Sequence, residues 1–325
     1  MKLILFLAIP SVLVAQQTRA PADIVDVQPE LVEPGVISTP LDEYDITFTP
    51  DGDTLYYSIA SPGPLTDQAS VIVRSVRQNG HWTPPVVAPF SGQYNDADPS
   101  ISPDGKRLFF ISVRPGDGKP LSRTDTDIWV VDRTATGWSE PTNLGRPVNS
   151  TAAEGYPVVA ADGTLYFYTQ RPDSKGHYNI YRSHLVDGHY GTPENLGATL
   201  NGKFDNADMA IAPDQSYIIF TSYGRPDALG NGDLYISFNR HGAWTTPKNL
   251  GAPINSIALE YTPRLSLDGQ YLYFTSNRGF ADRPWTRRLS MEEYRDSLTT
   301  IRNGNGNLYR VPLAPLLAAM RRTGP

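Results

Sequence analysis

The chain has 325 residues, a formal net charge of −6 at pH 7 and no cysteine. This acidic balance, without any run rich in Lys and Arg, argues against nucleic-acid binding, which requires a basic face over the phosphates. The lack of cysteine excludes disulfides, thiolate metal sites, a cysteine nucleophile and a lipidated-cysteine anchor. Aromatic residues make up 10% of the chain and charged residues 19%, and Gly and Pro are frequent, a mixture that favours short strands joined by turns.

Residues 1–20 have the pattern of a secretory signal peptide and leader. Lys2 precedes an apolar run over 3–14, and Ala15 then precedes two glutamines. The run is too short to span a bilayer as a stable helix. We expect export to the periplasm or the extracellular space, with no transmembrane segment after signal removal. A retained membrane anchor is the alternative.

Five short turns recur along the chain at intervals of 52 to 58 residues. They are Pro50-Asp51-Gly52, Pro103-Asp104-Gly105, Ala161-Asp162-Gly163, Pro213-Asp214-Gln215 and Leu267-Asp268-Gly269. Each turn precedes a strand rich in aromatic residues, at the spacing of one four-stranded propeller blade with its loops. The sequence therefore predicts five repeats, near residues 41–95, 96–151, 152–203, 204–257 and 258–313.

The two ends of the repeat array have complementary defects. Residues 29–38 match the pattern of a fourth strand, yet no strands precede them. After the third strand of the last repeat, over 307–311, the chain turns to Pro312 and a helix-like tail. We predict an all-β, five-bladed β-propeller over residues 21–313, in which the N-terminal strand completes the last blade. Closure of the ring removes the exposed edge strands that invite aggregation.

Two short helices are expected outside the repeat pattern. Ser290 and Glu293 have capping-box spacing, which predicts a helix from about Met291 to Ile301. The tail, residues 314–325, should form a second helix over Pro315–Arg322, with proline at its start. Both should pack on the ring rather than carry chemistry.

The second repeat, Asp96–Arg133, carries the most complete motif. It has an acid, then Ser-Pro-Asp-Gly-Lys, a Phe-rich strand ending in Ser-Val-Arg, and then Asp-Ile-Trp. These residues resemble the propeller repeats of the TolB-type (WD-like) family, and the resemblance extends over roughly 28–313. It implies an exported or periplasmic β-propeller used mainly as a binding platform, without implying one activity. Serine peptidases also use this repeat, but the chain has no Gly-x-Ser-x-Gly elbow.

An acid or amide lies eight positions before the turn aspartate in every repeat. These residues are Glu43, Asp96, Glu154, Asn206 and Glu260. Arginines near the end of the second strand are the expected hairpin neighbours of three of them, and we interpret the pairs Asp96–Arg114, Glu154–Arg171 and Glu260–Arg278 as structural clasps. Glu43 has no such arginine in its own repeat, so Arg278 of the adjacent blade is a candidate to compensate it.

A second set lies six positions before each turn aspartate: Asp45, Asp98, Tyr156, Asp208 and Thr262. Because residues two apart on a strand face the same way, the two sets should form two tiers of an acidic channel mouth. We expect this mouth to bind a polar small molecule, a glycan or peptide, or a cell-envelope protein. The predicted ligand-binding residues are Glu43, Tyr44, Asp45, Asp98, Asp208, Glu260 and Tyr261. We expect a monomer.

Two other uses of the mouth stay open. Carboxylate oxygens suit Ca²⁺, although no cofactor is required and no compact calcium loop is present. A glycoside hydrolase or other hydrolase would use two carboxylates from the set Glu43, Asp98, Asp208 and Glu260, about 5–10 Å apart.

Overall fold

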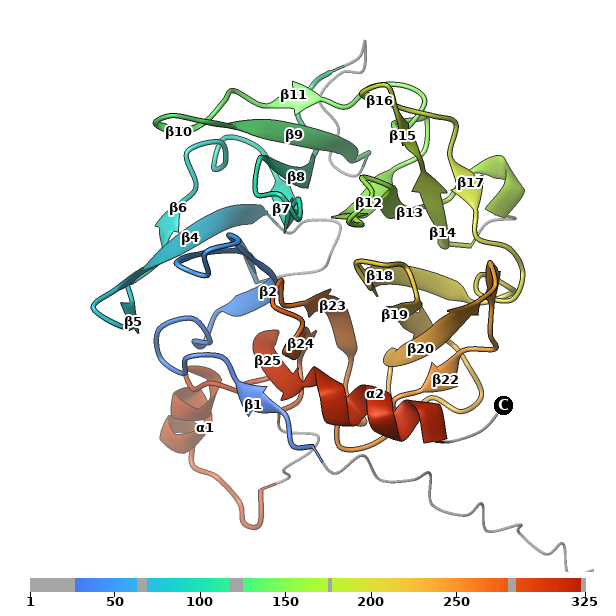
Figure 1. The fold of residues 1–325 in the computed structure, drawn as a ribbon. Coiled ribbons are helices and arrows are strands. Elements are labelled where there is room, and N and C mark those ends of the chain that lie inside the picture. The colour runs from blue at the N-terminus through green and yellow to red at the C-terminus, as the bar shows by residue number, and fades with distance from the viewer. Residues whose placement is uncertain (1–26, 63–68, 117–124, 175–176, 280–284, 323–325) are drawn as a thin grey trace, which may run out of the picture.

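The computed structural model describes residues 27–62, 69–116, 125–174, 177–279 and 285–322. The predicted signal peptide lies outside these ranges. Five antiparallel sheets stand in a ring around a central axis (Figure 1). The predicted five-bladed β-propeller is confirmed, and we number its blades by the order of their innermost strands along the chain.

Every blade has the same strand order from the axis outward. The innermost strands are β2 (Asp42–Phe48), β7 (Asp96–Ile101), β12 (Glu154–Val159), β18 (Asp205–Ile211) and β23 (Glu260–Leu265). The second strands are β3 (Thr54–Ala60), β8 (Arg107–Ser112), β13 (Leu165–Thr169), β19 (Tyr217–Tyr223) and β24 (Tyr271–Ser276). The third strands are β4 (Ser70–Gln78), β9 (Asp127–Thr134), β14 (Asn179–Ser183), β20 (Asp233–Arg240) and β25 (Asn307–Pro312).

The outer edge of each blade consists of two-residue strands. In chain order they are β5 (His81–Trp82), β6 (Val86–Val87), β10 (Gly137–Trp138), β11 (Thr142–Asn143), β17 (Glu194–Asn195), β21 (Ala243–Trp244) and β22 (Lys248–Asn249). Blade three also has the hairpin of β15 (Leu185–Val186) and β16 (His189–Tyr190), and a 3₁₀ turn over Pro172–Ser174. Short outer strands leave little unpaired edge for another chain to join.

The N-terminal strand closes the ring as predicted. β1 (Glu30–Leu31) pairs antiparallel with β25, so the fifth sheet has the order β1-β25-β24-β23. The next residues continue the join, because the amide of Val32 donates to the Leu308 carbonyl at 2.9 Å. Ile37 is fully buried in a cluster with residues of blades one and five. The two ends of the repeat array are therefore held together by both hydrogen bonds and apolar burial.

Aromatic and aliphatic side chains of the second strands form the core between neighbouring blades. Phe109 of β8 packs with Leu165 and Phe167 of β13, and all three are buried. Tyr56 of β3 packs with Leu108 and Phe110 of β8 in the same way. Both faces of each second strand are covered, which explains why these strands read as aromatic runs rather than as alternating ones.

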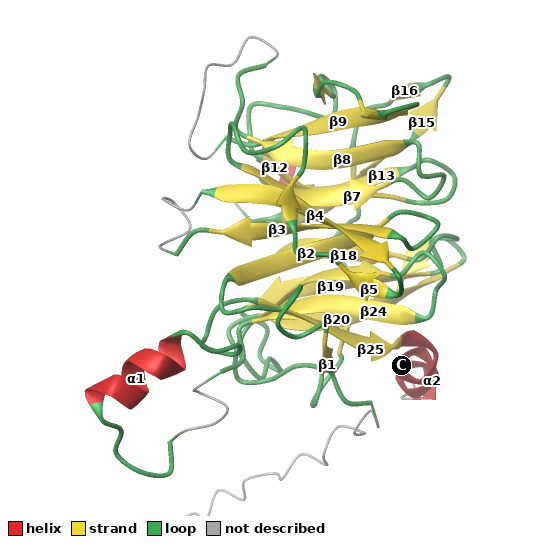
Figure 2. Cartoon of the chain, turned by 90° about the vertical axis from the view of Figure 1, so that its left-hand side faces the viewer, coloured by secondary structure: helices red, strands yellow, loops and turns green. Residues whose placement is uncertain are grey.

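Both predicted helices are present. α1 (Met291–Leu298) begins at Ser290 with the predicted capping box to Glu293, but it ends three residues before the predicted Ile301. α2 (Leu313–Arg322) begins slightly earlier than predicted and buries Leu313, Leu316 and Met320 against blades four and five. Figure 2 shows α1 projecting from one face of the ring and α2 near the opposite face. In the part of the chain that the structure describes, no helix is long and apolar enough to cross a membrane.

The closing segment generates a stability prediction. Ile37→Ala should lower the free energy of unfolding by about 2–5 kcal/mol, because it leaves a cavity where blades one and five meet. Urea unfolding followed by circular dichroism measures the loss. The partly buried neighbour Val36 provides the control, and Val36→Ala should cost clearly less. Equal effects of the two substitutions would contradict a closing role for Ile37.

Candidate functional site

The residues eight positions before each turn aspartate do not line the channel mouth. Glu43, Asp96, Glu154, Asn206 and Glu260 are all fully buried. Their partners lie in the preceding loop or in their own or the adjacent blade rather than across the axis. Glu260, for example, accepts hydrogen bonds from Ser256 and from Ser276. The sequence predicted that two tiers of side chains face the channel. That prediction is wrong for these five residues, which we call the outer tier.

A β-bulge explains this error. In all five innermost strands the register with the second strand shifts next to the position six before the turn aspartate. The residues at that position all have left-handed backbone: Asp45 (φ 45°), Asp98 (φ 55°), Tyr156 (φ 52°), Asp208 (φ 34°) and Thr262 (φ 47°). Left-handed backbone is uncommon for residues other than glycine. A bulge breaks the alternation of side chains, so residues two apart no longer share a face.

The three predicted arginine pairs are present. The Nη2 atom of Arg114 lies 2.6 Å from Asp96 Oδ1, and that of Arg278 lies 3.1 Å from Glu260 Oε1. The Arg171–Glu154 contact is longer, at 3.5 Å. These arginines also donate to main-chain carbonyls of the preceding loop, as Arg114 does to Phe90 at 3.1 Å. Each pair therefore joins the ends of the first two strands to the loop that enters the blade.

Blade four keeps this arrangement with a neutral residue. The Oδ1 atom of Asn206 accepts from Ser222 at 2.7 Å and from Arg225 at 3.3 Å, and its amide nitrogen donates to three carbonyls. An amide can thus replace the carboxylate in this position. Such a replacement is expected of a structural element and not of a catalytic carboxylate.

Glu43 is held by other means. Its carboxylate accepts from the hydroxyl of Thr39, from the Thr39 amide at 3.1 Å and from Asn307 Nδ2 at 3.1 Å. Arg278 binds Glu260 of its own blade, so the predicted compensation of Glu43 by Arg278 is wrong. Burial raises the pKa of Glu43 to about 7, although the bonds from Thr39 and Asn307 oppose the shift. Among the described residues, this acid is therefore held by hydrogen bonds from the preceding loop and from blade five, and it forms no ion pair.

The residues six positions before each turn aspartate, which we call the inner tier, do meet on the axis. They surround an arginine that the sequence interpretation missed. Arg264 of β23 donates through Nη2 to both oxygens of Asp45, at 2.8 and 2.9 Å, and through Nη1 to Ser100 at 3.1 Å. The hydroxyl of Tyr156 reaches Asp45 Oδ1 at 3.1 Å, and its ring lies 4.4 Å from the guanidinium carbon of Arg264. Side chains of four blades thus converge in one nearly buried cluster. Burial opposes the charge on Arg264, but Asp45 more than offsets this, so the pKa of Arg264 is raised.

Asp98 and Asp208 belong to the same tier but lack such a partner. Among the described residues, Asp98 accepts only from the amide of Tyr156, at 3.2 Å, and Asp208 only from the amide of Thr262, at 3.4 Å. They are 6% and 8% exposed, so little water reaches them. Burial raises the pKa of Asp208 to about 7 and that of Asp98 well above its ordinary range, and mutual repulsion among Asp45, Asp98 and Asp208 adds to both shifts.

Tyrosines surround these two acids. We call Tyr44, Tyr168, Tyr223 and Tyr261 the tyrosine cluster. Tyr44 and Tyr261 stack with ring centroids 6.5 Å apart, and all four side chains are partly exposed. Burial is the main cause that raises their phenol pKa values, and the negative charge of Asp98 or Asp208 contributes in every case. The cluster therefore lies close to both acids.

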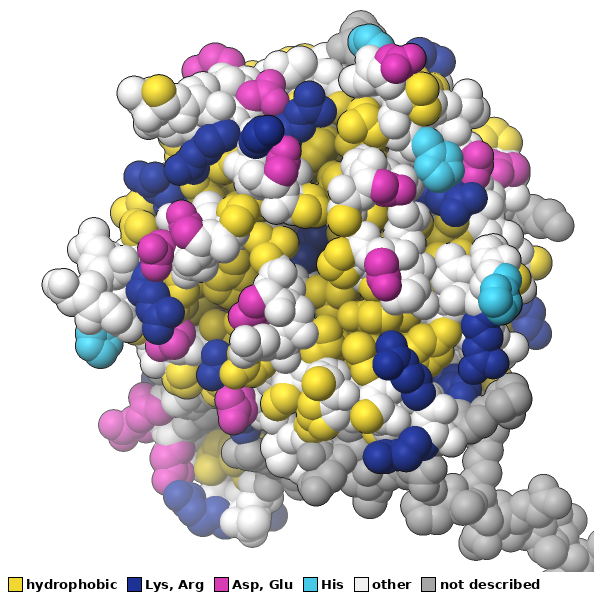
Figure 3. Space-filling view, viewed as in Figure 1, with side chains coloured by type: hydrophobic (Ala, Val, Ile, Leu, Met, Phe, Trp, Pro, Cys, Tyr) yellow, Lys and Arg dark blue, Asp and Glu magenta, His cyan; other side chains and the backbone are white. Residues whose placement is uncertain are grey.

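The tyrosine cluster lies toward the α1 face of the ring, where the innermost strands begin and the second strands end. On the opposite face, Figure 3 shows a central recess with a basic side chain at its floor. Arg264 is the basic side chain that the contacts place on the axis, and it is 5% exposed. The channel is thus acidic and aromatic toward one face and basic toward the other.

Sequence reasoning placed Asp45, Asp98, Tyr156 and Asp208 in the inner tier and named Tyr44 and Tyr261 beside it, but it missed Arg264, Tyr168 and Tyr223. Arg264 offered a signal, because it stands four positions before its turn aspartate where the other repeats have Thr47, Ser100, Val158 and Ala210. Tyr168 and Tyr223 offered none, because they stand at different positions of their two repeats.

Within the described ranges, no three His, Cys, Asp or Glu side chains are grouped closely enough to hold a metal ion. Binding of Ca²⁺ therefore stays a prediction of the sequence alone.

No protein-family model and no curated protein matches this chain. Solved structures are similar to it at low identity. An α-L-arabinofuranosidase from Podospora anserina in complex with cellotriose is 11% identical, with 89% of this chain and 97% of that chain covered and a TM-score of 0.48. A puromycin-hydrolyzing peptidase of Mycobacterium tuberculosis is 17% identical, with 75% and 36% covered and a TM-score of 0.43.

A Hadza microbial sialidase is 16% identical, with 72% of this chain and 53% of that chain covered and a TM-score of 0.42. The chain spans only about a third of the length of the puromycin-hydrolysing structures. At these identities and scores the likeness concerns the propeller fold alone and carries no argument about activity.

The clasps generate a graded stability prediction. Arg114→Ala should lower the free energy of unfolding by about 3–5 kcal/mol, because it leaves the fully buried Asp96 without its cation. Arg171→Ala is the matched control and should cost less, since its contact to Glu154 is longer. Urea unfolding of both variants measures the difference. If Arg114→Ala costs less than Arg171→Ala, the clasp does not stabilise blade two.

The buried acids predict a pH dependence of stability. Asp208 has a pKa of about 7 in the folded chain against an ordinary value of 3.8, so folding favours its neutral form. Its contribution to stability is complete below about pH 4 and is lost as the pH rises through about 7. Wild type should therefore lose free energy of unfolding over this interval, and Asp208→Asn should remove on the order of 4 kcal/mol of that loss. Unfolding curves from pH 4 to about 8 test this, and an unchanged slope in Asp208→Asn would contradict it.

Proposed function

We propose that this protein is an exported binding module that holds a polar ligand at the tyrosine cluster, with Asp98 and Asp208 as the acceptors of the ligand's hydrogen bonds. The observation that carries the proposal is the contrast between these two acids and the other acids of the innermost strands. Asp45 has Arg264, and the outer acids have arginines or several local donors, whereas Asp98 and Asp208 each have one backbone donor among the described residues.

The chemistry of this end of the channel supports a ligand rich in hydrogen-bond donors. Burial favours the neutral form of both acids, and a ligand that donates hydrogen bonds to them or carries positive charge would favour the ionised form. An ionised carboxylate accepts through two oxygens, so each acid then has accepting capacity beyond its one bond. Partly exposed tyrosine rings offer flat faces to a sugar ring or to a cationic group. The hydroxyls of a glycan and the ammonium or guanidinium groups of a peptide or of a protein loop all meet these requirements.

Two further parts of the proposal come from the sequence. The signal-like residues 1–20 support export, and the repeat motif supports membership of the TolB-type propellers. A binding platform fits both. A hydrolytic role would require one of the two acids to act on a bound substrate, and it is the outcome that the experiment below is designed to detect.

Titration calorimetry with a panel of neutral glycans and cationic peptides tests the proposal. Asp98→Asn and Asp208→Asn should each weaken binding of the best ligand by about tenfold or more, because an amide replaces one carboxylate acceptor with a donor. The exposed Asp187 provides the control, and Asp187→Asn should leave the affinity unchanged. Unchanged affinity in both channel variants would place the ligand elsewhere.

The same ligands, incubated with the protein and separated by chromatography, distinguish binding from catalysis. A binding module returns every ligand intact. Bond cleavage that is lost in Asp98→Asn or Asp208→Asn while binding is retained would replace the proposal with a carboxylate-dependent hydrolase.

A further inference from the structure

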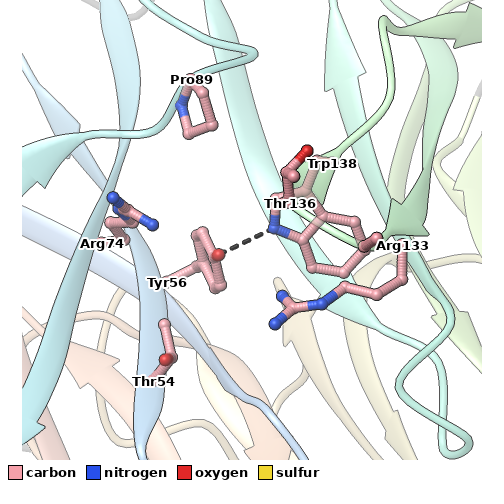
Figure 4. A pocket seen from close by; sticks show the side chains of 9 residues that line it. Thr54, Tyr56, Arg74, Pro89, Arg133, Thr136 and Trp138 are labelled. Atoms are coloured by element: carbon pink, nitrogen blue, oxygen red, sulfur yellow. Dashed lines mark hydrogen bonds between the residues drawn. The ribbon is translucent and has the colours of Figure 1, made fainter.

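A pocket of about 410 Å³ lies between blades one and two, away from the axis. Tyr56, Arg74, Arg133 and Trp138 form its polar and aromatic wall. Figure 4 shows Arg74 and Arg133 on either side of Tyr56, whose hydroxyl accepts a hydrogen bond from Trp138 Nε1 at 2.8 Å. The volume is within the range of small-molecule sites, roughly 300–1,000 Å³.

The repeats provide an internal comparison for Arg74. In blades one, three and five, a tyrosine of the second strand is directly opposite an arginine of the third, in the pairs Tyr56–Arg74, Tyr166–Arg182 and Tyr273–Arg310. In blades three and five, the fourth strand has a glutamate directly opposite this arginine: Glu194 opposite Arg182 and Glu30 opposite Arg310. Both form ion pairs, at 3.0 and 3.5 Å. In blade one the corresponding residue is Val86.

Arg74 therefore has no carboxylate opposite it on the fourth strand, unlike Arg182 and Arg310. Within the described ranges its side chain takes part in no hydrogen bond or ion pair. Arg133 makes no side-chain hydrogen bond there either, and its guanidinium lies over Trp138 at 5.1 Å from the ring centroid. The charge of Arg133 helps to lower the pKa of Asp51, although the hydrogen bond from Thr49 is the main cause of that shift. The Oδ1 atom of Asp51 already accepts hydrogen bonds from the Thr49 hydroxyl and the Asp53 amide.

The hydroxyl of Tyr56 adds a third donor. In blade three the corresponding hydroxyl of Tyr166 donates to Gln215 at 2.5 Å. The Tyr56 hydroxyl accepts from Trp138, and its own proton has no acceptor among the described residues. Two guanidinium groups and one phenol thus line the same pocket without an acceptor of their own.

We propose that this pocket is an oxyanion site, in which Arg74, Arg133 and Tyr56 bind a carboxylate, sulfate or phosphate group of an anionic ligand about the size of one monosaccharide. Guanidinium groups bind such oxyanions through charge-assisted hydrogen bonds. Tyr56 and Trp138, fixed against each other by their hydrogen bond and a T-shaped contact with centroids 6.2 Å apart, form the wall for the rest of the ligand. The site is independent of the channel and of the ligand proposed for it.

The chain provides its own design for blocking the site. Val86→Glu restores on β6 the carboxylate that blades three and five have opposite their arginines. It should pair with Arg74 without removing any donor. Because Val86 is 53% exposed, this substitution should not disturb the core. Arg182→Ala is the matched control, since it removes an arginine in the same strand position that already has a partner.

Calorimetric titrations at low ionic strength with glucuronate, glucose 6-sulfate, glucose 6-phosphate, inorganic phosphate and uncharged glucose test the proposal. We expect at least one of the three sugar anions to bind, glucose not to bind, and inorganic phosphate to bind more weakly than the best sugar anion. Arg74→Ala, Arg133→Ala and Val86→Glu should each weaken binding by about tenfold or more, whereas Arg182→Ala should not. The order among the three sugar anions identifies the preferred oxyanion.

Three results would overturn the proposal: no binding of any anion below about 10 mM, equal binding of glucose, or equal losses in Arg182→Ala and Arg74→Ala. Thermal unfolding of every variant separates lost binding from lost fold. Val86→Glu keeps the test valid if Arg74→Ala or Arg133→Ala proves unstable, because it leaves both arginines in place.

Discussion

The arrangement of polar groups in this propeller depends on one backbone feature, the β-bulge in each innermost strand. Five residues other than glycine adopt left-handed backbone at equivalent positions, at a cost on the order of 1 kcal/mol each. Hydrogen bonds from their own amides offset part of this cost, as between Asp98 and the Ser58 hydroxyl at 3.2 Å. The bulge directs one residue of each strand toward the axis and leaves the residue two positions earlier turned into the blade. Without it, charged side chains of both sets would compete for the same narrow channel.

The acids of the innermost strands consequently separate into three electrostatic classes. Those turned into the blades, such as Asp96 and Glu260, have arginines or a dense set of local donors. Asp45 has a buried bidentate partner in Arg264. Among the residues that the structure describes, Asp98 and Asp208 have neither, and burial shifts them toward the neutral form. A buried acid with a single backbone donor is costly, so a site that holds two of them is the place in this fold where a ligand has the most to contribute.

Both proposed sites lie where one repeat departs from the others. Blades with a common architecture act as controls for one another, because the same position can be compared in nearly the same surroundings. Arg182 and Arg310 show what the third-strand arginine does when a carboxylate faces it, and Arg74 lacks that carboxylate. Likeness to other propellers of known structure offers no such comparison, since the fold is shared by proteins with unrelated activities. The function of a propeller is therefore better sought where its own repeats differ.

The sequence alone determined the fold to the level of blades, strands and ring closure. Turn residues, aromatic strands and their period are local signals. Ring closure could be predicted because residues 29–38 match the fourth strand that the last repeat lacks, and a closed ring has no free edge. The capping box of α1 was likewise visible, although the helix end at Leu298 was not. The hairpin pairing of Asp96 with Arg114 followed from register, because residues at paired strand ends are neighbours in any antiparallel hairpin.

Only the tertiary structure decided which way the polar side chains point and which of them meet. Strand alternation, a local rule, predicted that Glu43 and Glu260 face the channel. They are instead buried against loops and where blades meet, because the bulge depends on hydrogen bonds between blades. Arg264, Tyr156 and Asp45 are separated by about a hundred residues or more along the chain and meet only because the ring closes. The periodic position six before each turn aspartate placed Asp45 and Tyr156 at the axis, but Arg264 has no counterpart in the other repeats, so its contacts and the pocket beside Arg74 became visible only in three dimensions.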